Sequence, residues 1–204
     1  MNKTFSVWGK EDPETVSLIK EAPLKGYWLN LAGGDGRYVS LLLKKVTKLE
    51  VMDKDRSAIK KLLSKCPKEF KNKLKIKIGD ITEKLPYPDR TFDGIFCTGT
   101  LHLFSEDILI NIFSEIERVL KSKGSILIDF ATNIKRKMPD GTMYKYPNEP
   151  DYKTSSAEKL LKKLLKNFDF KIYKSKVAPQ QIKMNSTGHI FSCNFFLIHG
   201  KRKK

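Results

Sequence analysis

The stretch Gly26-Tyr-Trp-Leu-Asn-Leu-Ala-Gly-Gly-Asp-Gly36 has the residue types of a ligand-binding turn: an apolar run that ends in closely spaced glycines. Glycine has no Cβ and tolerates positive φ, so such a turn lets the backbone come close to a ligand. The helical pattern that follows adds unpaired N–H groups and the positive end of a helix dipole. The segment alone predicts a nucleotide-like ligand.

Acidic side chains follow the next two expected strands. Asp53 comes 17 residues after Gly36, and a carboxylate there can accept hydrogen bonds from both hydroxyls of a ribose. Asp80 follows the third strand, where it can hold an adenine amino group. In open α/β sheets, ligands bind beyond the carboxyl ends of the strands, which is where these residues are expected.

Two observations argue against a dinucleotide. Its fingerprint needs a third glycine where this chain has Val39. A pyrophosphate also suits basic or neutral surroundings, whereas Asp35, Asp53, Asp55 and Asp80 gather in the expected cleft. A ligand without phosphates and with a positive charge fits better, and S-adenosylmethionine is such a ligand.

Strand and helix patterns alternate along the chain, as in a mostly parallel sheet with helices on both faces. Residues 131–154 break the alternation as a turn-rich insertion, and Ser155-Ser-Ala-Glu158 predicts a capping box. The last two strands have no helix between them, so we expect them to pair antiparallel. The expected strands are 27–31, 48–52, 74–78, 92–97, 125–130, 170–173 and 190–198, and the expected helices are 12–22, 37–45, 56–66, a segment capped by Ser105 that ends at 121–124, and one opened by the capping box.

Composition predicts one domain spanning residues 1–204, in a cytoplasmic protein without metal. A chain of 204 residues with 40% hydrophobic residues suits a single α/β domain. Apolar runs are too short to span a membrane, and the N-terminus has no signal-peptide pattern. Cys66, Cys97 and Cys193 form no metal or disulfide motif.

The formal net charge of +17 is concentrated near the C-terminus. Residues 155–204 contain 12 Lys and Arg against two acids, so this quarter contributes +10. Clustered basic residues favour nucleic acid, whereas scattered lysines serve solubility. RNA therefore stays open as a partner of this basic protein.

The chain resembles the class I S-adenosylmethionine-dependent methyltransferases of the small type 11 group. The matching segments are Asn30–Gly36, Val51-Met-Asp53, Gly79-Asp80, Leu85-Pro-Tyr-Pro-Asp-Arg-Thr-Phe-Asp93, Leu101-His102 and Arg118-Val-Leu-Lys-Ser-Lys-Gly124. This resemblance implies a Rossmann-like open sandwich with a seven-stranded sheet whose last strand is antiparallel. It also implies S-adenosyl-L-methionine as the cofactor.

The resemblance assigns expected roles to individual residues. The turn would hold the methionine moiety, Asp53 with Lys54 the ribose, Asp80 with Ile81 the adenine, and Thr98 the far side of the cofactor. The expected cofactor-binding set is Asn30, Ala32, Gly34, Gly36, Asp53, Lys54, Asp80, Ile81 and Thr98.

Two residues of this set depart from the family pattern. Where Asn30 stands, the family has an acid, so the charge that favours the sulfonium and ammonium groups is missing. Where Ala32 stands, the family has glycine, and alanine fits only if its φ is negative.

His102 is the candidate general base, with Asp129 a second candidate, although in-line methyl transfer can proceed by alignment alone. Trp8, within the N-terminal segment 1–22, and the insertion 131–154 are expected to form a substrate lid.

The segment after the fourth strand, Cys97-Thr-Gly-Thr-Leu-His102, lacks the signature of enzymes that methylate base amino groups. We expect a methyltransferase that acts on a small-molecule acceptor. Two alternatives stay open: a tRNA-modifying methyltransferase that uses the basic C-terminal quarter, and a cofactor-binding pseudoenzyme.

Overall fold

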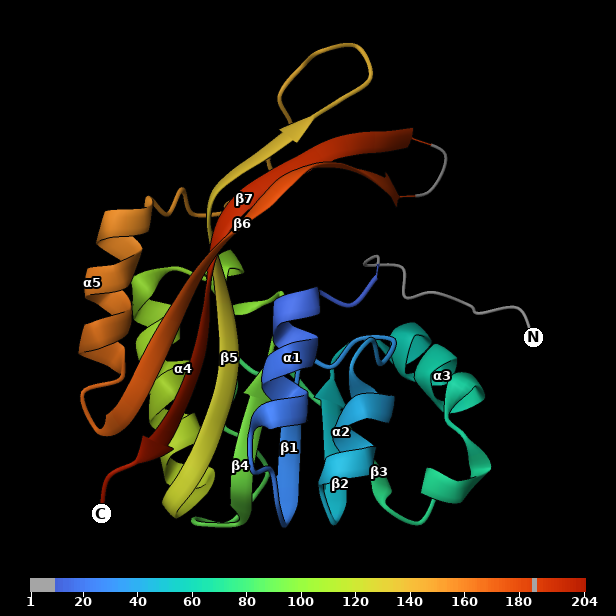
Figure 1. Cartoon of the computed structure of the whole chain (residues 1–204), viewed down its shortest axis with the longest axis vertical. Coiled ribbons are helices and arrows are strands. Elements are labelled where there is room, and N and C mark those ends of the chain that lie inside the picture. The colour runs from blue at the N-terminus through green and yellow to red at the C-terminus, as the bar shows by residue number, and fades with distance from the viewer. Residues whose placement is uncertain (1–9, 185–186) are drawn as a thin grey trace.

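The computed structural model describes residues 10–184 and 187–204, and they build a seven-stranded sheet in the order β3-β2-β1-β4-β5-β7-β6 (Figure 1). β7 is antiparallel to both neighbours, while the pairs among β1 to β5 are parallel. This confirms the predicted Rossmann-like sandwich with an antiparallel last strand. The strands are β1 (Tyr27–Leu31), β2 (Lys48–Asp53), β3 (Leu74–Ile78), β4 (Phe92–Cys97), β5 (Leu120–Lys137), β6 (Phe168–Met184) and β7 (Thr187–Arg202).

Helices cover both faces of the sheet and bury two apolar cores. α1 (Pro13–Glu21), α2 (Val39–Lys45) and α3 (Arg56–Lys65) pack on one face, where Trp28, Leu42 and Leu127 are fully buried. α4 (Glu106–Val119) and α5 (Thr154–Leu164) pack on the other, against Phe92 and Phe130. Within the described residues, no helix is long and apolar enough to cross a membrane.

The last three strands are much longer than expected. β5 continues to Lys137, so the first seven residues of the predicted insertion belong to a strand. They pair with β7, for example Ala131 with Phe195 and Lys137 with Ile190. Local composition does not reveal such non-local pairing, which is why the predicted boundary is wrong. In Figure 1 the β6–β7 hairpin extends past the carboxyl ends of the parallel strands and leans over α1.

The predicted helix ends near α4 and α5 are also corrected. α4 stops at Val119 and passes directly into β5, not at residues 121–124, and Ser105 is its N-cap residue without a side-chain cap bond. α5 begins at Thr154 after Lys153, with no side-chain cap, so the capping box does not form.

Thr154 instead joins α5 to the sheet. Its hydroxyl oxygen accepts hydrogen bonds from Asn133 Nδ2 at 2.8 Å and Asn194 Nδ2 at 3.1 Å. These contacts with β5 and β7 decide where the helix starts.

Candidate functional site

Strand register aligns the predicted site residues in one row across the carboxyl edge of the sheet. Leu31 pairs with Met52, and Asn30 with Phe96, which pairs with Leu127. One or two residues further on, the register therefore aligns Asp53, Ala32 and Thr98 at the ends of β2, β1 and β4 with Asp129 in the middle of β5. Neighbouring strands lie about 4.8 Å apart, so the row from Asp53 to Asp129 is about 14 Å long.

The glycine turn is fastened to β2 at two points. The N–H of Gly33 donates to Met52 O at 3.1 Å, and the N–H of Gly34 donates to Asp53 Oδ2 at 2.7 Å. A Cβ on Gly33 would lie 2.4 Å from Val51 Cγ1, so only glycine fits there. The turn is thus a preformed cradle of bare backbone beside a carboxylate.

Asp53 links the turn to the start of α3. Its Oδ1 accepts the N–H of Asp55 at 2.8 Å, and Asp55 in turn caps α3 by accepting from Ser57 N at 2.7 Å. Hydrogen bonds from Ser57 and Ala58 hold the pKa of Asp55 below its usual value. Each carboxylate oxygen of Asp53 can accept a second hydrogen bond, so both stay suited to a ribose diol.

Asp80 follows β3 and is held in a fixed orientation. Its Oδ1 accepts from the N–H and the hydroxyl of Thr82, each at 2.9 Å, and its Oδ2 pairs with Lys54 Nζ at 3.1 Å. Burial works against the charge of Asp80, but these hydrogen bonds outweigh it and lower the pKa. The adjacent Ile81 is buried, so it offers an apolar contact beside a polar edge.

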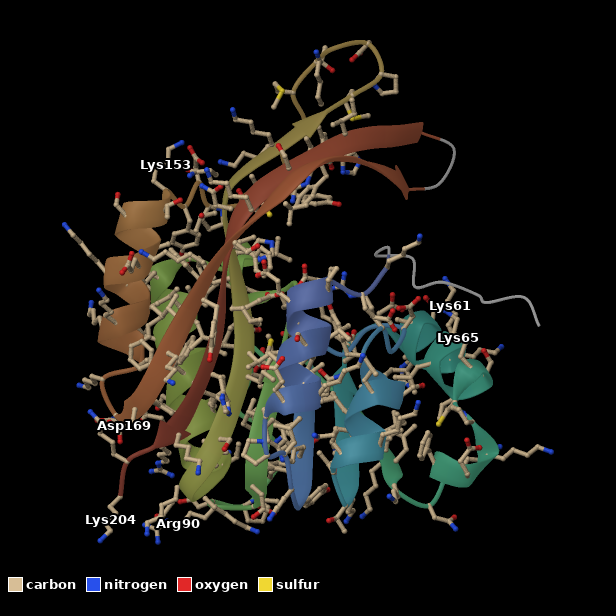
Figure 2. All side chains as sticks on the ribbon, in the orientation of Figure 1. Lys61, Lys65, Arg90, Lys153, Asp169 and Lys204 are labelled. Carbon is tan, nitrogen blue, oxygen red and sulfur yellow. The ribbon has the colours of Figure 1, made fainter. Side chains whose placement is uncertain are left out.

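Asp35 does not belong to the exposed acidic cleft that its position in the sequence suggests. Its side chain is 1% exposed and lies 3.2 Å from Lys65 Nζ of α3. Figure 2 labels Lys65 on this helix. This ion pair links the turn to α3. The expectation that Asp35 contributes negative charge to the ligand site is therefore wrong.

Asn30 is buried at the end of β1, and Ala32 begins the turn with φ of +51°. The condition under which alanine was expected to fit, a negative φ, is therefore not met. Gly34 and Gly36 also have positive φ, at +55° and +85°. The closure of the turn onto Asp53 forces alanine into the left-handed region, which costs about 1 kcal/mol relative to glycine.

Ala32→Gly is expected to raise the free energy of unfolding by about 1 kcal/mol, because glycine adopts this backbone conformation without strain. Urea unfolding of the variant and the wild type measures the change. Ala58→Gly, inside α3, is the control and should lower stability by about 1 kcal/mol. A loss of stability in Ala32→Gly would contradict the strain at this position.

His102 lies in the short 3₁₀ segment Leu101–Leu103 after β4 and is 7% exposed. Its ring packs edge-on against Phe130, with centroids 6.3 Å apart. Burial lowers the pKa of His102 to about 4; Glu149 opposes this shift and Arg136 adds to it. Its Nδ1 has no hydrogen-bond partner among the described residues.

A pH titration of stability should reveal the buried neutral His102. Because its folded pKa of about 4 lies below the ordinary 6.5, the unfolded chain is protonated first as the pH falls. The stability due to neutral His102 is complete above pH 7 and is lost toward pH 4. Between pH 8 and pH 5, the wild type should lose about 2 kcal/mol more than His102→Asn in urea unfolding. Parallel pH profiles would contradict this assignment.

Asp129 ends the row on β5 and is partly exposed. Its Oδ1 accepts the N–H of Gly99 at 2.7 Å, just after Thr98. Burial raises the pKa of Asp129 to about 6, against the lowering effects of the Gly99 N–H and the Arg37 charge, and Asp12 raises it further. Asp129 is therefore a carboxylate in surroundings that disfavour its charge.

The second half of β5 and residues 143–153 line a cavity. The Tyr144 N–H donates to Arg136 O and the Asn133 N–H to Tyr152 O, each at 2.8 Å, so residues 144–152 lie alongside β5. A cavity of about 260 Å³ lies between them. Its lining mixes aromatic side chains, such as Tyr144 and Tyr152, with charged ones such as Lys145.

A buried ion pair closes this segment onto β5. Arg136 donates from both terminal nitrogens to Glu149, at 2.7 and 2.8 Å, and the two side chains are 6% and 2% exposed. The guanidinium lies 4.6 Å from the Tyr146 ring centroid and 5.7 Å from that of Phe191. Nothing in the local sequence indicated this pair, because its members lie in a strand and in a loop.

The lysines of α5, one part of the basic C-terminal quarter, are engaged in ion pairs on the helix surface. On α5, Lys162 pairs with Glu158 at 3.0 Å and Lys163 pairs with Glu106 at 2.8 Å. Figure 1 shows α5 on the outer flank of the molecule, beyond the strands that carry the glycine turn. Trp8, the aromatic residue of the expected N-terminal lid, lies outside the described residues.

Comparison with known proteins agrees with this geometry. Residues 29–124 match the family model described as a methyltransferase domain. A 59-residue stretch is 41% identical to "Probable methyltransferase ltbC" of Aspergillus luteorubrus, covering 28% of this chain and 21% of that protein. The match thus spans about a fifth of the curated relative.

Solved structures share the fold at low sequence identity. YcgJ of Bacillus subtilis superposes with a TM-score of 0.70 and 16% identity, over 95% of this chain and all of that one. A methyltransferase of Methanosarcina mazei gives 0.63 and 17%, over 96% and 100%. A phosphoethanolamine N-methyltransferase of Haemonchus contortus gives 0.63 and 16%, over 88% and 41%.

Proposed function

We propose that this chain is a class I methyltransferase that transfers a methyl group from S-adenosylmethionine to a small organic acceptor, a proposal supported by the match of residues 29–124 to the methyltransferase domain model and by the shared fold. The observation that carries the proposal is the bare glycine turn fastened to Asp53 by the 2.7 Å bond from Gly34 N. A glycine-rich backbone turn next to a carboxylate whose two oxygens can each accept a further hydrogen bond fits an adenosyl ligand whose ribose faces Asp53.

The row supplies a place for each part of the cofactor. Asp53 would accept the ribose hydroxyls, with Lys54 beside it, and Asp80 with Ile81 would hold the adenine. Ala32, Gly34 and Gly36 would line the methionine chain together with Asn30, and Thr98 the opposite side. When bound, S-adenosylmethionine supplies a methyl group that is activated by a positively charged sulfur.

The protein's part in the transfer is alignment and exclusion of water. Asp53 and the glycine turn would hold the cofactor so that an acceptor nucleophile could approach in line with the carbon–sulfur bond. The residues after β4 and β5 direct the acceptor towards this line. His102 is neutral near pH 7, so a hydrogen bond from its ring can orient an acceptor without adding a positive charge.

The cavity beside β5 suits the acceptor. It lies between β5 and residues 143–153, and about 260 Å³ accommodates a small molecule, not a folded macromolecule. The Haemonchus neighbour binds the small acceptor phosphoethanolamine. Residues 138–153 would act as the lid, held closed by the Arg136–Glu149 pair.

Calorimetric titration with S-adenosylmethionine and S-adenosylhomocysteine tests the cofactor, and we expect micromolar affinity for both. Cell extract is then separated into small-molecule, protein and RNA fractions, each incubated with protein and labelled cofactor. Label in the small-molecule fraction is the expected result. Label in RNA alone would move the acceptor to RNA, and binding without transfer to any fraction would indicate a pseudoenzyme.

A further inference from the structure

We propose that the amino-terminal edge of the parallel strands carries a second binding site, which takes the diphosphate group of a small ligand. A cavity of about 240 Å³ opens there between the segment 23–26 that leads into β1, residues 121–125 of β5 and Lys201 of β7. Figure 2 labels Asp169, which pairs with Lys201, at this end of the molecule. β1 separates the cavity from the glycine turn by about 17 Å, since each of its residues rises about 3.3 Å. The site therefore goes beyond the one that carries the proposed function.

The lining of this cavity has an excess of positive charge. Its charged residues are Lys25, Asp93, Lys121, Lys123 and Lys201. Asp93 Oδ1 accepts from Lys121 Nζ at 2.8 Å, and Asp93 Oδ2 accepts the N–H of Tyr27 at 2.8 Å. The other three lysines form no ion pair within the part of the chain that the structure describes. Because these lysines repel one another, an anion that enters between them gains more than it would beside a single lysine.

An arch in β5 forms one wall of the cavity. β5 advances over residues 120–125 while its partner β4 advances only over residues 92–94, so three residues of β5 are surplus and leave the ladder. Lys123 on this arch has a φ of +60°, a conformation that lysine rarely adopts. A Cβ on Gly124 would lie 2.8 Å from Leu120 Cδ1, so the arch is tightly folded. It therefore carries its lysines on a fixed backbone and not on an open loop.

The segment before β1 forms a second wall and is fixed in the same way. Trp28 Nε1 donates to Lys25 O at 2.8 Å. Gly26 has a φ of +78°, and a Cβ on it would overlap the carboxylate of Asp93. Both walls are therefore held by the fold before a ligand arrives, so that little ordering of the chain opposes binding.

The size and the lining of the cavity favour a compact phosphate group. Pockets for drug-sized ligands have about 300–1,000 Å³, so a cavity of about 240 Å³ admits a smaller group. Lysine binds phosphate as a point charge, and the hydroxyls of Ser122 and Ser125 in the lining can donate to phosphate oxygens. Trp28 is 1% exposed, so the aromatic ring of the lining offers no face on which a base could stack. A diphosphate has about three negative charges at neutral pH, which matches the three lysines without an ion pair.

Calorimetric titration of the full chain with pyrophosphate, at about 50 mM salt, tests this site. We expect one saturable site that binds pyrophosphate about tenfold more tightly than orthophosphate. Lys25→Gln, Lys123→Gln and Lys201→Gln should each weaken the binding of pyrophosphate by about fivefold to tenfold. Lys61→Gln is the charge-matched control, since Figure 2 labels Lys61 on α3, far from this edge. It should change the affinity by less than about twofold.

Asp93→Asn should produce a gain of affinity, which a misfolded variant cannot imitate. The amide oxygen can still accept the N–H of Tyr27, while Lys121 loses its acidic partner and becomes available to the ligand. Pyrophosphate should therefore bind about threefold to fivefold more tightly. The affinity for S-adenosylmethionine should stay unchanged in all of these variants, because the two sites lie at opposite ends of β1.

A wild type that gives no saturable heat with pyrophosphate would overturn the inference and leave the proposed function intact. Equal weakening by Lys61→Gln and Lys123→Gln would also overturn it, because the general surface charge would then bind the anion. Weaker binding by Asp93→Asn would show that Lys121 takes no part. A short single-stranded RNA is the last probe. If it bound more tightly than pyrophosphate and lost affinity in the same three lysine variants, the cavity would belong to a nucleic-acid surface instead.

Discussion

Asp53→Ala is expected to weaken the binding of S-adenosylmethionine by at least about a hundredfold, because two charge-assisted hydrogen bonds to the ribose are lost, each worth about 1.5–3 kcal/mol. The variant also removes the acceptor for Gly34 N, which lies 2.7 Å from Asp53 Oδ2 in the wild type. The turn then loses one of its two hydrogen bonds to β2 and keeps the bond from Gly33 N to Met52 O. Calorimetric titration of the variant and the wild type measures the effect.

Asp55→Ala is the matched control for this prediction. Asp55 stands two residues away and caps α3 through Ser57 N and Ala58 N, but it has no expected contact with the cofactor. Its loss should cost about 1 kcal/mol of stability and leave cofactor affinity within about twofold. If Asp53→Ala bound as tightly as the wild type, the ribose would not face Asp53 and the orientation of the cofactor would have to be reversed.

Glu149→Gln is expected to lower the free energy of unfolding by about 3–5 kcal/mol, because it leaves the Arg136 guanidinium buried without a counter-charge. In the wild type, burial disfavours the Glu149 carboxylate, but hydrogen bonds from Arg136 outweigh this and lower its pKa. Urea unfolding at pH 7 measures the loss. Since the pair holds residues 138–153 on β5, acceptor turnover should fall as well.

Two further variants distinguish a buried pair from charge loss in general. The double variant Arg136→Met with Glu149→Leu removes both charges and should recover most of the stability. Asp151→Asn breaks the Lys153–Asp151 pair, whose side chains are 65% and 57% exposed, and should change stability by less than about 0.5 kcal/mol. Figure 2 labels Lys153 at the start of α5, beside the same segment. A similar small effect of Glu149→Gln would show that the segment opens freely to water.

Periodic patterns defined the parallel half of the fold well. β1, β3 and β4 have the predicted bounds, and β2, α2 and α3 differ by one or two residues. These elements are short, and each has turn residues or proline at its ends, so local chemistry fixes where they stop. The antiparallel half was predicted in kind but not in extent, because its pairing depends on residues far away in the chain.

The sequence by itself determined the ends of β1 to β4 to within one residue and therefore which of their residues stand at the carboxyl edge. Asp53, Asp80 and the glycine turn could be named because a motif fixes residue types at set distances from a strand. Their binding roles stay predictions that cofactor titrations will test. The family, the cofactor class and the Rossmann-like sheet follow from the same motifs and agree with the comparisons.

Only the tertiary structure decided which charges are open to a ligand and which are used inside the protein. Asp35 and Asp53 lie in similar sequence surroundings, yet Asp35 is buried against Lys65 while Asp53 faces the turn. Likewise, Asp129 accepts the Gly99 N–H only because β4 and β5 are neighbours in the sheet. Burial and pairing depend on neighbours from other strands and helices, and no local pattern in a single sequence encodes them.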